Sequence, residues 1–246
     1  MLALIGGTGL SRLAGLEVTA RRAVRTPFGE PSCPVTLGDL GGAPVAFMAR
    51  HGYGHTIAPH EVNYRANIWA LREVGVRQII AIASVGGIRV DCAPGALVLP
   101  DQIIDYTWGR EATFFEGPDQ PVRHIDFTHP YSQSVRQRIS QAARDCAEPL
   151  IEGATYGATQ GPRLETAAEI TRMERDGCDL VGMTGMPEAS LAREIELEYA
   201  ALAVVVNHAA GRASSVNGVH LDSLAGTLEA AMARVHRVLA AAARRG

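Results

Sequence analysis

Short apolar runs alternate along this chain with longer stretches of helical periodicity, and this alternation limits the possible folds more than any other feature. The candidate strands are Leu2–Ile5, Val45–Met48, Gln78–Ala83, Ala96–Leu99, Asp179–Met183 and Ala201–Val206. The candidate helices are Val62–Val74, Ser134–Ala147, Thr166–Asp176, Glu188–Glu196 and Leu221–Ala243. Nearly continuous hydrophobicity in strands is typical of a sheet that is covered on both faces. We therefore expect an α/β fold with a central mixed, largely parallel sheet flanked by helices.

Length and local composition favour one domain over residues 1–246. A chain of 246 residues has a size that single α/β domains often reach, and no internal repeat or low-complexity linker divides it. The stretch Trp108–Pro130 is polar, aromatic and interrupted by glycine and proline. It is too long for a simple connection, and loops of that length are usually functional, disordered or at a subunit contact.

Charge and hydropathy exclude several classes of protein. The chain is 47% hydrophobic and 20% charged with a net charge of −3, so we expect no nucleic-acid partner. No apolar run approaches the roughly 18–20 residues of a membrane span. The N-terminus also lacks a basic segment followed by a signal-peptide core. These features predict a cytoplasmic protein without a membrane partner.

Residue usage narrows the chemistry further. Every basic residue is arginine, and the absence of lysine excludes a Walker-type phosphate loop, a pyridoxal Schiff base and a lysine-imine aldolase. The four cysteines are widely separated and show no CxxC pairing: Cys33, Cys92, Cys146 and Cys178. We therefore expect free thiols, with no disulfide framework and no metal site.

Two strand ends carry groups that suit a small anion. The first apolar run is followed by Gly6-Gly7-Thr8-Gly9, where glycines let backbone N–H groups approach a ligand and Thr8 adds a hydroxyl. The second is followed by Arg50 and His51, which we interpret as charge-assisted donors for phosphate oxygens. Together they predict the two halves of an anion site.

Four further segments, rich in small or polar residues, follow an apolar strand or precede a helix. They are Ala83–Gly87, Thr159–Thr166, Gly182–Glu188 and Asn207–Gly211. Ligands of open α/β sheets bind beyond the carboxyl ends of the strands. We therefore expect all six segments to converge on one site.

Five motifs, in this order and at these spacings, resemble the family of trimeric purine nucleoside phosphorylases and methylthioadenosine phosphorylases. They are IGGTGL (5–10), TPFGEPS (26–32), ARHGYGHTIAPHEVNYRANIWAL (49–71), GPRLETAAEI (161–170) and VGMTGMPEASLARE (181–194). The match extends from about Ile5 to Leu239. The resemblance implies cleavage of the N-glycosidic bond of a purine nucleoside by phosphate, giving the free base and a ribose 1-phosphate. It also implies a homotrimer with sites near subunit contacts, and phosphate as co-substrate without a cofactor.

The resemblance also assigns the phosphate and sugar contacts. Phosphorolysis through an oxocarbenium-like sugar needs a fixed phosphate and stabilisation of the leaving purine. By resemblance, phosphate is held by Thr8, Arg50, His51, Ala83, Ser84 and Thr184, and Met183 lies along the ribose. Without the family, Met183 would be read as core filler and the two threonines as turn or helix caps.

The base-reading residues depart from the methylthioadenosine pattern. Enzymes of the family that read an adenine carry aspartates after the late strand, whereas this chain reads Val206-Asn207-His208-Ala209. Members that act on 6-oxopurines carry an asparagine there and a glutamate in the Gly-Pro segment, which match Asn207 and Glu165. An Asn amide can donate to O6 while its carbonyl accepts from N7–H, and Glu165 can accept from N1–H. The sequence therefore predicts a hypoxanthine- or guanine-type base. Without the family, Glu165 would be read as a helix-start acid and Asn207 as a turn residue.

Within this assignment, Asn207 and His51 are the predicted catalytic residues. The predicted substrate contacts are Leu164, Glu165, Met183, Asn207, His208 and Ala209.

The 5′ end of the nucleoside leaves two alternatives. The N-terminal motifs and the stretch Gly109–Phe127 resemble the methylthio-nucleoside branch, so S-methyl-5′-thioinosine is the expected substrate. His55 and His124 are candidates beside the 5′ group, His124 from a neighbouring subunit. His220 falls near a position where hydroxyl-accepting members carry histidine and methylthio members an apolar residue. If His220 lines the pocket, inosine or guanosine becomes the substrate; otherwise it is a surface residue before a helix.

The sequence also bears on two other classes of function. A dinucleotide-binding domain would need the full GxGxxG spacing and, about 20 residues later, an aliphatic strand that ends in an acidic residue, and both are missing. A non-catalytic nucleotide-binding relative would not need to keep Thr8, Arg50, His51 and Thr184. Methylthioadenosine phosphorylase activity is the remaining option within the family.

Overall fold

The computed structural model describes residues 1–118, 120–220 and 224–245, and in these residues eleven strands join in one sheet. The strands are β1 (Leu2–Gly6), β2 (Leu16–Arg22), β3 (Val35–Leu40), β4 (Pro44–Ala49), β5 (Gln78–Gly87), β6 (Leu97–Leu99), β7 (Gln102–Asp105), β8 (Ile151–Glu152), β9 (Thr155–Ala158), β10 (Leu180–Gly182) and β11 (Glu198–His208). The expected mixed, largely parallel α/β sheet is confirmed, because the pairs β1–β4, β1–β5, β5–β11, β6–β8, β7–β9 and β9–β10 are parallel.

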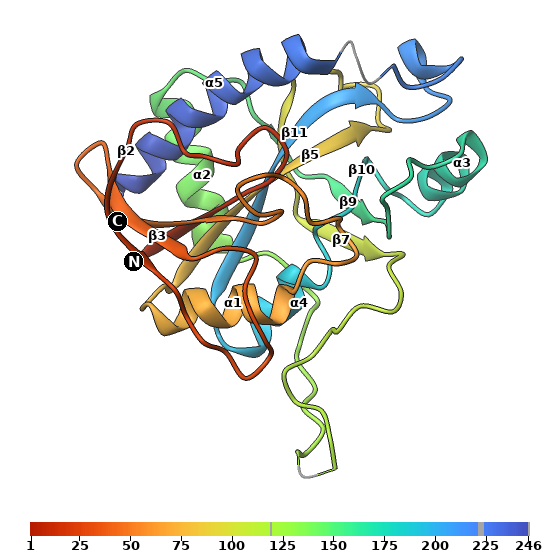
Figure 1. The fold of residues 1–246 in the computed structure, drawn as a ribbon. Helices are drawn as coiled ribbons and strands as arrows, with labels where there is room; N and C mark the ends of the chain where they lie inside the picture. Colours follow the sequence, from red (N-terminus) through yellow and green to blue (C-terminus); the bar gives the residue numbers. More distant parts are fainter. Residues whose placement is uncertain (119, 221–223, 246) are drawn as a thin grey trace.

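Five helices lie against this sheet in the described residues: two packed pairs and one helix that stands apart. They are α1 (Tyr64–Glu73), α2 (Gln133–Asp145), α3 (Ala167–Arg175), α4 (Glu188–Glu194) and α5 (Leu224–Ala243), with a 3₁₀ turn at Ala213–Ser215. Helix α2 packs on α5 and both contact β11, while α1 packs on α4, which contacts β11 from the other side (Figure 1). Helix α3 lies apart, beside β9 and β10 (Figure 1).

Strand β5 positions the site. It pairs in parallel with β1 and along its whole length with β11, and its last two residues pair antiparallel with β10. Strand β1 is fully buried, and seven consecutive residues of β11 are buried as well, as expected for central strands covered on both faces. The carboxyl ends of β1, β5 and β11 therefore lie together at one edge of the core.

Some strands carry no apolar run and were not predicted. Strand β2 is mostly exposed and polar, LEVTARR, because it lies at the edge of the sheet and, among the described strands, pairs only with β3. Strands β7, β8 and β9 are two to four residues long. The predicted helices are present with slightly shorter bounds, and the predicted start of the last helix at Leu221 lies outside the described residues.

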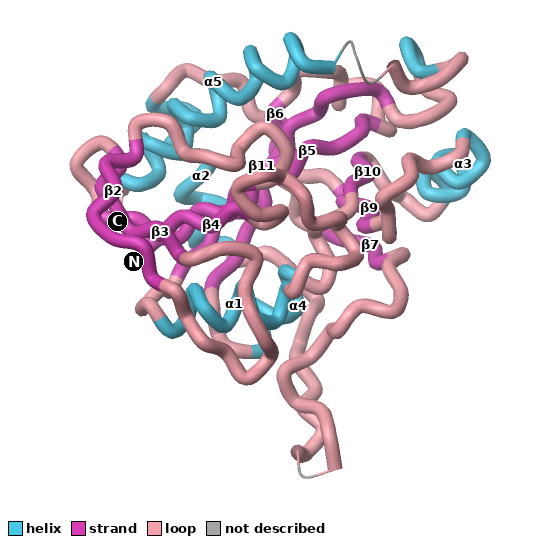
Figure 2. The backbone as a smooth tube through the Cα atoms, viewed as in Figure 1, coloured by secondary structure: helices cyan, strands magenta, loops and turns pink. Residues whose placement is uncertain are grey.

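The long polar stretch is a loop, as the sequence indicates. After β7 the chain leaves the body as an extended arm, seen as a projecting loop in Figure 2, and returns to α2. Trp108 and Val122 on this arm are strongly exposed. None of the described helices combines the length and hydrophobicity that a membrane span requires.

Candidate active site

A cavity of about 480 Å³ opens where the six predicted segments meet. Most of the predicted site residues line it: Thr8, Arg50, His51, His55, Ala83, Ser84, Leu164, Glu165, Met183, Thr184, Asn207 and Ala209. They come from the ends of β1, β4, β5, β9, β10 and β11. The structure thus brings together residues that are up to about 200 positions apart in the sequence, at the edge where α/β sheets bind ligands.

Three predicted residues lie outside this cavity in the described structure. His208 turns its Nδ1 to the Ser214 hydroxyl at 2.8 Å. His124 is exposed on the projecting arm, so in this chain it does not reach the cavity. His220 is exposed, and its neighbour Val219 lines the cavity instead. At this position the cavity wall is therefore formed by the apolar Val219, and the alternative in which His220 lines the pocket is not realised.

Arg50 is the buried cation of the site. The side chain is 1% exposed, and its Nε and Nη2 donate to the two oxygens of Glu188 at 2.6 and 2.7 Å. Its Nη1 donates to the Ile82 carbonyl at 3.0 Å. The Tyr199 hydroxyl donates to the same carboxylate at 2.9 Å. A planar guanidinium has five N–H donors, so this network fixes the plane of Arg50 and leaves N–H groups for an anion.

Glu188 keeps Arg50 charged despite burial. Burial alone would lower the pKa of the guanidinium, but the Glu188 carboxylate raises that pKa above its ordinary value. Glu188 is fully buried at the start of α4. Breaking a buried pair by removing one partner costs about 3–5 kcal/mol, because the other charge is left uncompensated. Sequence reasoning had not singled out Glu188, although it lies within the VGMTGMPE motif.

Two glycines allow this packing. A Cβ on Gly7 would lie 3.0 Å from Arg50 Nη1 and 2.7 Å from the Ile82 carbonyl oxygen, so a side chain there would displace the guanidinium. Gly161 has a φ of +64°, and a Cβ there would overlap the Met183 sulfur. Glycine at these positions keeps Arg50 and Met183 against the cavity.

His51 differs from the expected charged donor. Burial and the adjacent Arg50 charge lower the pKa of His51 to about 4, so the ring is neutral near pH 7. Its Nδ1 lies 2.8 Å from the Ile57 carbonyl oxygen, which can only accept, so Nδ1 carries the proton. The other ring nitrogen, Nε2, is then an acceptor. This pKa and the Ile57 contact contradict the prediction of a charge-assisted His51 donor.

The low pKa of His51 predicts a loss of stability in acid. The unfolded chain takes up this proton near pH 6.5, whereas the folded chain does so only near pH 4. As pH falls between these values the unfolded state is favoured, by up to about 3 kcal/mol from this residue. Urea unfolding at pH 7 and pH 4.5 should show a smaller decline for His51→Gln than for the wild type. His60→Gln, at an exposed histidine, is the control and should decline as the wild type does. An equal decline in His51→Gln and the wild type would contradict the low pKa of His51.

Two hydroxyls complete the corner beside Arg50. The Ser84 hydroxyl donates to the Thr8 carbonyl at 3.1 Å, and the Thr8 hydroxyl lies 3.4 Å from His55 Nε2. Thr184 is 8% exposed, and its backbone N–H donates to the Tyr156 hydroxyl at 3.4 Å. These are weak or local contacts, so the side-chain hydroxyls of Thr8 and Thr184 can turn to an anion held by Arg50.

A β-bulge places Asn207. Strand β11 pairs with β5 residue by residue up to Val205, and Val206 is then an extra residue before Asn207 opposes Gly86. As a result Val206 and Asn207, consecutive in the chain, both line the cavity. Bulges often re-aim side chains next to active sites. The Asn207 amide donates to the His208 carbonyl at 2.7 Å.

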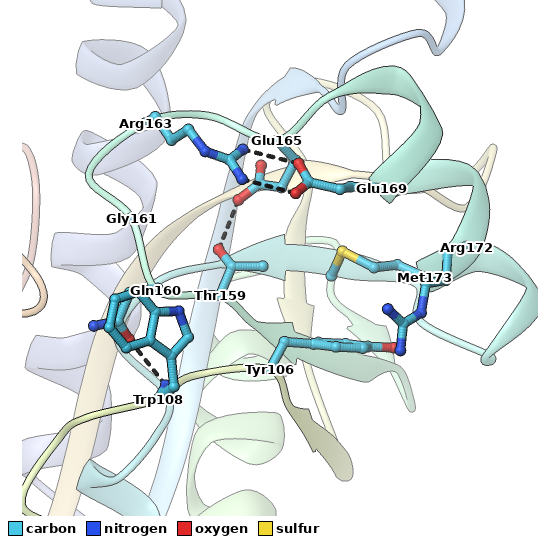
Figure 3. Close-up of a pocket in the computed structure, with 10 residues that line it drawn as sticks. All are labelled: Tyr106, Trp108, Thr159, Gln160, Gly161, Arg163, Glu165, Glu169, Arg172 and Met173. Atoms are coloured by element: carbon cyan, nitrogen blue, oxygen red, sulfur yellow. Dashed lines mark hydrogen bonds and ion pairs between the residues drawn. The ribbon is translucent and has the colours of Figure 1, made fainter.

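Glu165 lies between the site cavity and a second cavity of about 440 Å³ beside α3. Figure 3 shows the carboxylate turned to the Thr159 hydroxyl, which donates to Glu165 Oε1 at 2.6 Å. The nearby Arg163 is held by Glu169 at 2.7 and 2.9 Å (Figure 3). The Glu165 carboxylate thus lies at the wall of the site cavity and accepts a hydrogen bond from the neutral Thr159 hydroxyl.

Arg110, from the projecting arm, holds the segments of the site together. Its Nη1 donates to the carbonyls of Met183 and Met186 at 2.8 and 2.6 Å, and its Nη2 to that of Gln160 at 2.8 Å. The guanidinium also lies over the Tyr64 ring, 5.4 Å from its centroid. Sequence reasoning did not identify Arg110 as part of the site, because its partners are 46 to 76 residues away.

Comparisons with known proteins identify the family of this chain. Residues 1–244 match the family model described as the phosphorylase superfamily. The chain is 57% identical over 210 residues to a protein of Xanthomonas campestris named a probable S-methyl-5′-thioinosine phosphorylase, covering 85% of this chain and 84% of the relative. It is 47% identical over 215 residues to the 6-oxopurine nucleoside phosphorylase of Pyrococcus furiosus, covering 85% and 80%. The solved structure of methylthioadenosine phosphorylase from Schistosoma mansoni with adenine is similar at a TM-score of 0.93 and 33% identity, covering 99% and 91%.

Proposed function

This chain belongs to the phosphorylase superfamily, and we propose that it cleaves 6-oxopurine nucleosides with phosphate, with S-methyl-5′-thioinosine as preferred substrate. The products are hypoxanthine and 5-methylthioribose 1-phosphate. One observation carries the proposal: a buried, permanently charged Arg50 shares a cavity with the pair Asn207 and Glu165. The names of the relatives support the same reaction on the same class of base.

The cation end of the cavity is the proposed phosphate site. The N–H groups of Arg50 that Glu188 and Ile82 leave over would hold two phosphate oxygens, with hydroxyls from Thr8, Ser84 and Thr184 around them. Because His51 Nε2 is an acceptor, we assign it a hydrogen bond from an O–H of a phosphate monoanion or of the ribose. The reaction needs no covalent enzyme nucleophile, because phosphate is itself the nucleophile, and we propose that it needs no cofactor.

The chemical step is a displacement at C1′ of the ribose. The bond from C1′ to N9 breaks with its electron pair going to the purine, while a phosphate oxygen bonds to C1′ through an oxocarbenium-like transition state. The leaving purine is neutralised by a proton from solvent at N7. The Asn207 carbonyl accepts a hydrogen bond from that N7–H, and such preorganised groups stabilise charge that develops in the transition state. Met183 packs along the sugar.

The base is read by hydrogen-bond polarity. Asn207 offers an N–H to the oxygen at C6, and the Glu165 carboxylate accepts from N1–H, which a 6-oxopurine has and adenine lacks. An adenine reader would need an acceptor where the Asn207 amide donates. Leu164 and Ala209 line the same part of the cavity and suit the flat apolar faces of a purine.

We propose that the 5′ end of the nucleoside meets Val219, which lines the cavity while His220 does not, and that this favours a methylthio group over a hydroxyl. A buried hydroxyl without a partner costs about 1–3 kcal/mol, whereas a methylthio group is apolar. The second candidate, a general inosine and guanosine phosphorylase, is favoured by the name of the Pyrococcus furiosus relative. His55 would be the polar group nearest the ribose in that case.

Val219→His separates these two candidates. We expect it to raise kcat/KM for inosine relative to S-methyl-5′-thioinosine by about tenfold, since the imidazole gives the 5′-hydroxyl a partner. The matched control is Val216→His, at a residue that is 63% exposed and outside the cavity lining, which should leave the ratio unchanged. A wild type that cleaves inosine as fast as S-methyl-5′-thioinosine would favour the second candidate.

We also propose that the protein is a cytoplasmic homotrimer. The proposal rests on the family resemblance, and the exposed Trp108 and Val122 on the projecting arm suit a subunit contact. In such an assembly, His124 on the same arm would lie near the site of a neighbouring subunit.

A further inference from the structure

The carboxylate proposed to read the base needs a fixed direction, and among the described residues one side chain, that of Thr159, donates a hydrogen bond to it. Glu165 is half-buried and lines both the site cavity and the cavity beside α3. A carboxylate at such a boundary could turn to either side. The side it faces decides whether an acceptor is offered to the base.

Thr159 holds this carboxylate from the side of the cavity beside α3, which Thr159 lines. Its hydroxyl donates to Glu165 Oε1 at 2.6 Å (Figure 3). The same hydroxyl lies 3.3 Å from the Gly182 carbonyl oxygen. The backbone N–H of Thr159 donates to the same Gly182 carbonyl at 2.8 Å. Thr159 follows β9 directly, so its position is fixed by the β9–β10 pair. Hydrogen bonds from a hydroxyl to a carboxylate are charge-assisted and strong.

The nearby cation does not compete for this role. Arg163 gives its hydrogen bonds to both oxygens of Glu169 and to the Leu164 carbonyl. In the described residues, Thr159 is therefore the side chain that donates to Glu165.

The segment that carries Thr159 is itself anchored. Arg110 Nη2 donates to the carbonyls of Thr159 and Gln160 at 3.2 and 2.8 Å. Since the same guanidinium holds the Met183 carbonyl, the base-reading and sugar-facing segments share one support.

We propose that Thr159 is a specificity-determining positioning residue, whose hydroxyl holds Glu165 as an acceptor toward the base. This inference rests on the proposed reading of a 6-oxopurine by Glu165. With one oxygen occupied by the Thr159 hydroxyl, the other accepts from N1–H. Adenine presents a lone pair at N1, and a fixed carboxylate repels it. Without the hydroxyl, the carboxylate can rotate away from the base, so discrimination falls.

Thr159→Val tests this inference, because valine keeps the shape and removes the hydroxyl. The measured quantity is the ratio of kcat/KM for S-methyl-5′-thioinosine to that for S-methyl-5′-thioadenosine. We expect the ratio to fall about tenfold in Thr159→Val, and to stay within about threefold of wild type in Thr159→Ser, which keeps the donor. Thr159→Ala, without hydroxyl or branching, should fall with the valine variant and replaces it if that variant does not fold.

Two controls separate positioning from stability. Thr171→Val is a matched substitution on α3, where the hydroxyl donates to the Ala167 carbonyl, and it should leave the ratio unchanged. Melting temperatures of all variants are measured beside the rates, since a purely structural role would lower both rates together. A wild-type ratio in Thr159→Val and Thr159→Ala would overturn the inference.

The outcome also distinguishes this inference from the proposed function. Glu165→Gln is the reference variant. If it loses the preference and Thr159→Val keeps it, Glu165 reads the base without help from Thr159. If the wild type shows no preference for the 6-oxo nucleoside, the proposed function fails first.

Discussion

Arg50→Gln is expected to remove effective phosphate use and to destabilise the fold at the same time. The first effect follows from losing the cation of the proposed phosphate site, and we expect kcat/KM for phosphate to fall roughly 10²- to 10³-fold. The second follows from Glu188, which is left as a buried charge 0% exposed, at a cost of about 3–5 kcal/mol. Phosphate saturation curves and urea unfolding measure the two effects separately.

A double variant keeps these effects apart. In Arg50→Gln with Glu188→Gln both side chains are neutral amides that can hydrogen-bond to each other, so most of the stability should return while phosphate use stays lost. Arg234→Gln is the matched control. Arg234 forms an ion pair with Glu148, with an N–O distance of 2.7 Å, and neither residue lines the site cavity. Normal phosphate saturation in the double variant would contradict the assignment of Arg50 to phosphate binding.

Asn207→Asp is expected to shift the choice of base. A carboxylate at this position only accepts, so it loses the donor to O6 and gains an acceptor for the 6-amino group. A mispaired buried polar group costs about 1–3 kcal/mol. We therefore expect the ratio of 6-amino to 6-oxo activity to rise about 10- to 100-fold. The measurement compares kcat/KM for S-methyl-5′-thioadenosine and S-methyl-5′-thioinosine in variant and wild type.

The matched control for this variant is Asn63→Asp, at the cap of α1, where a carboxylate can accept the same hydrogen bond from the Ala66 N–H. It should leave the ratio as it is. An unchanged ratio in Asn207→Asp would mean that Asn207 does not face the base.

The sheet and the site cavity were predictable where the signal is local. Buried parallel strands need unbroken apolar runs, so β1, β4, β5 and β11 are visible in the sequence. The residues that follow such a run are at the ligand-binding edge, which led to Arg50 and Asn207. Strand β2 was missed for the opposite reason, since an exposed edge strand has no apolar run.

The supporting contacts were not predictable, because their partners are distant in sequence. Arg50 and Glu188 are 138 residues apart, and Arg110 reaches Met183 across 73 residues. The state of His51 depends on burial and on a carbonyl six residues away, which no motif encodes. The bulge at Val206 shifts the register by one residue and so decides which side chains face the cavity.

The most direct test of phosphorolysis of a 6-oxopurine nucleoside is the release of free base from four nucleosides, with and without phosphate. The four are S-methyl-5′-thioinosine, inosine, S-methyl-5′-thioadenosine and adenosine. We expect fast, phosphate-dependent release of hypoxanthine from S-methyl-5′-thioinosine, slower release from inosine, and little release of adenine from the other two. Preference for S-methyl-5′-thioadenosine would contradict the base reading by Asn207 and Glu165, and release that does not depend on phosphate would contradict the mechanism.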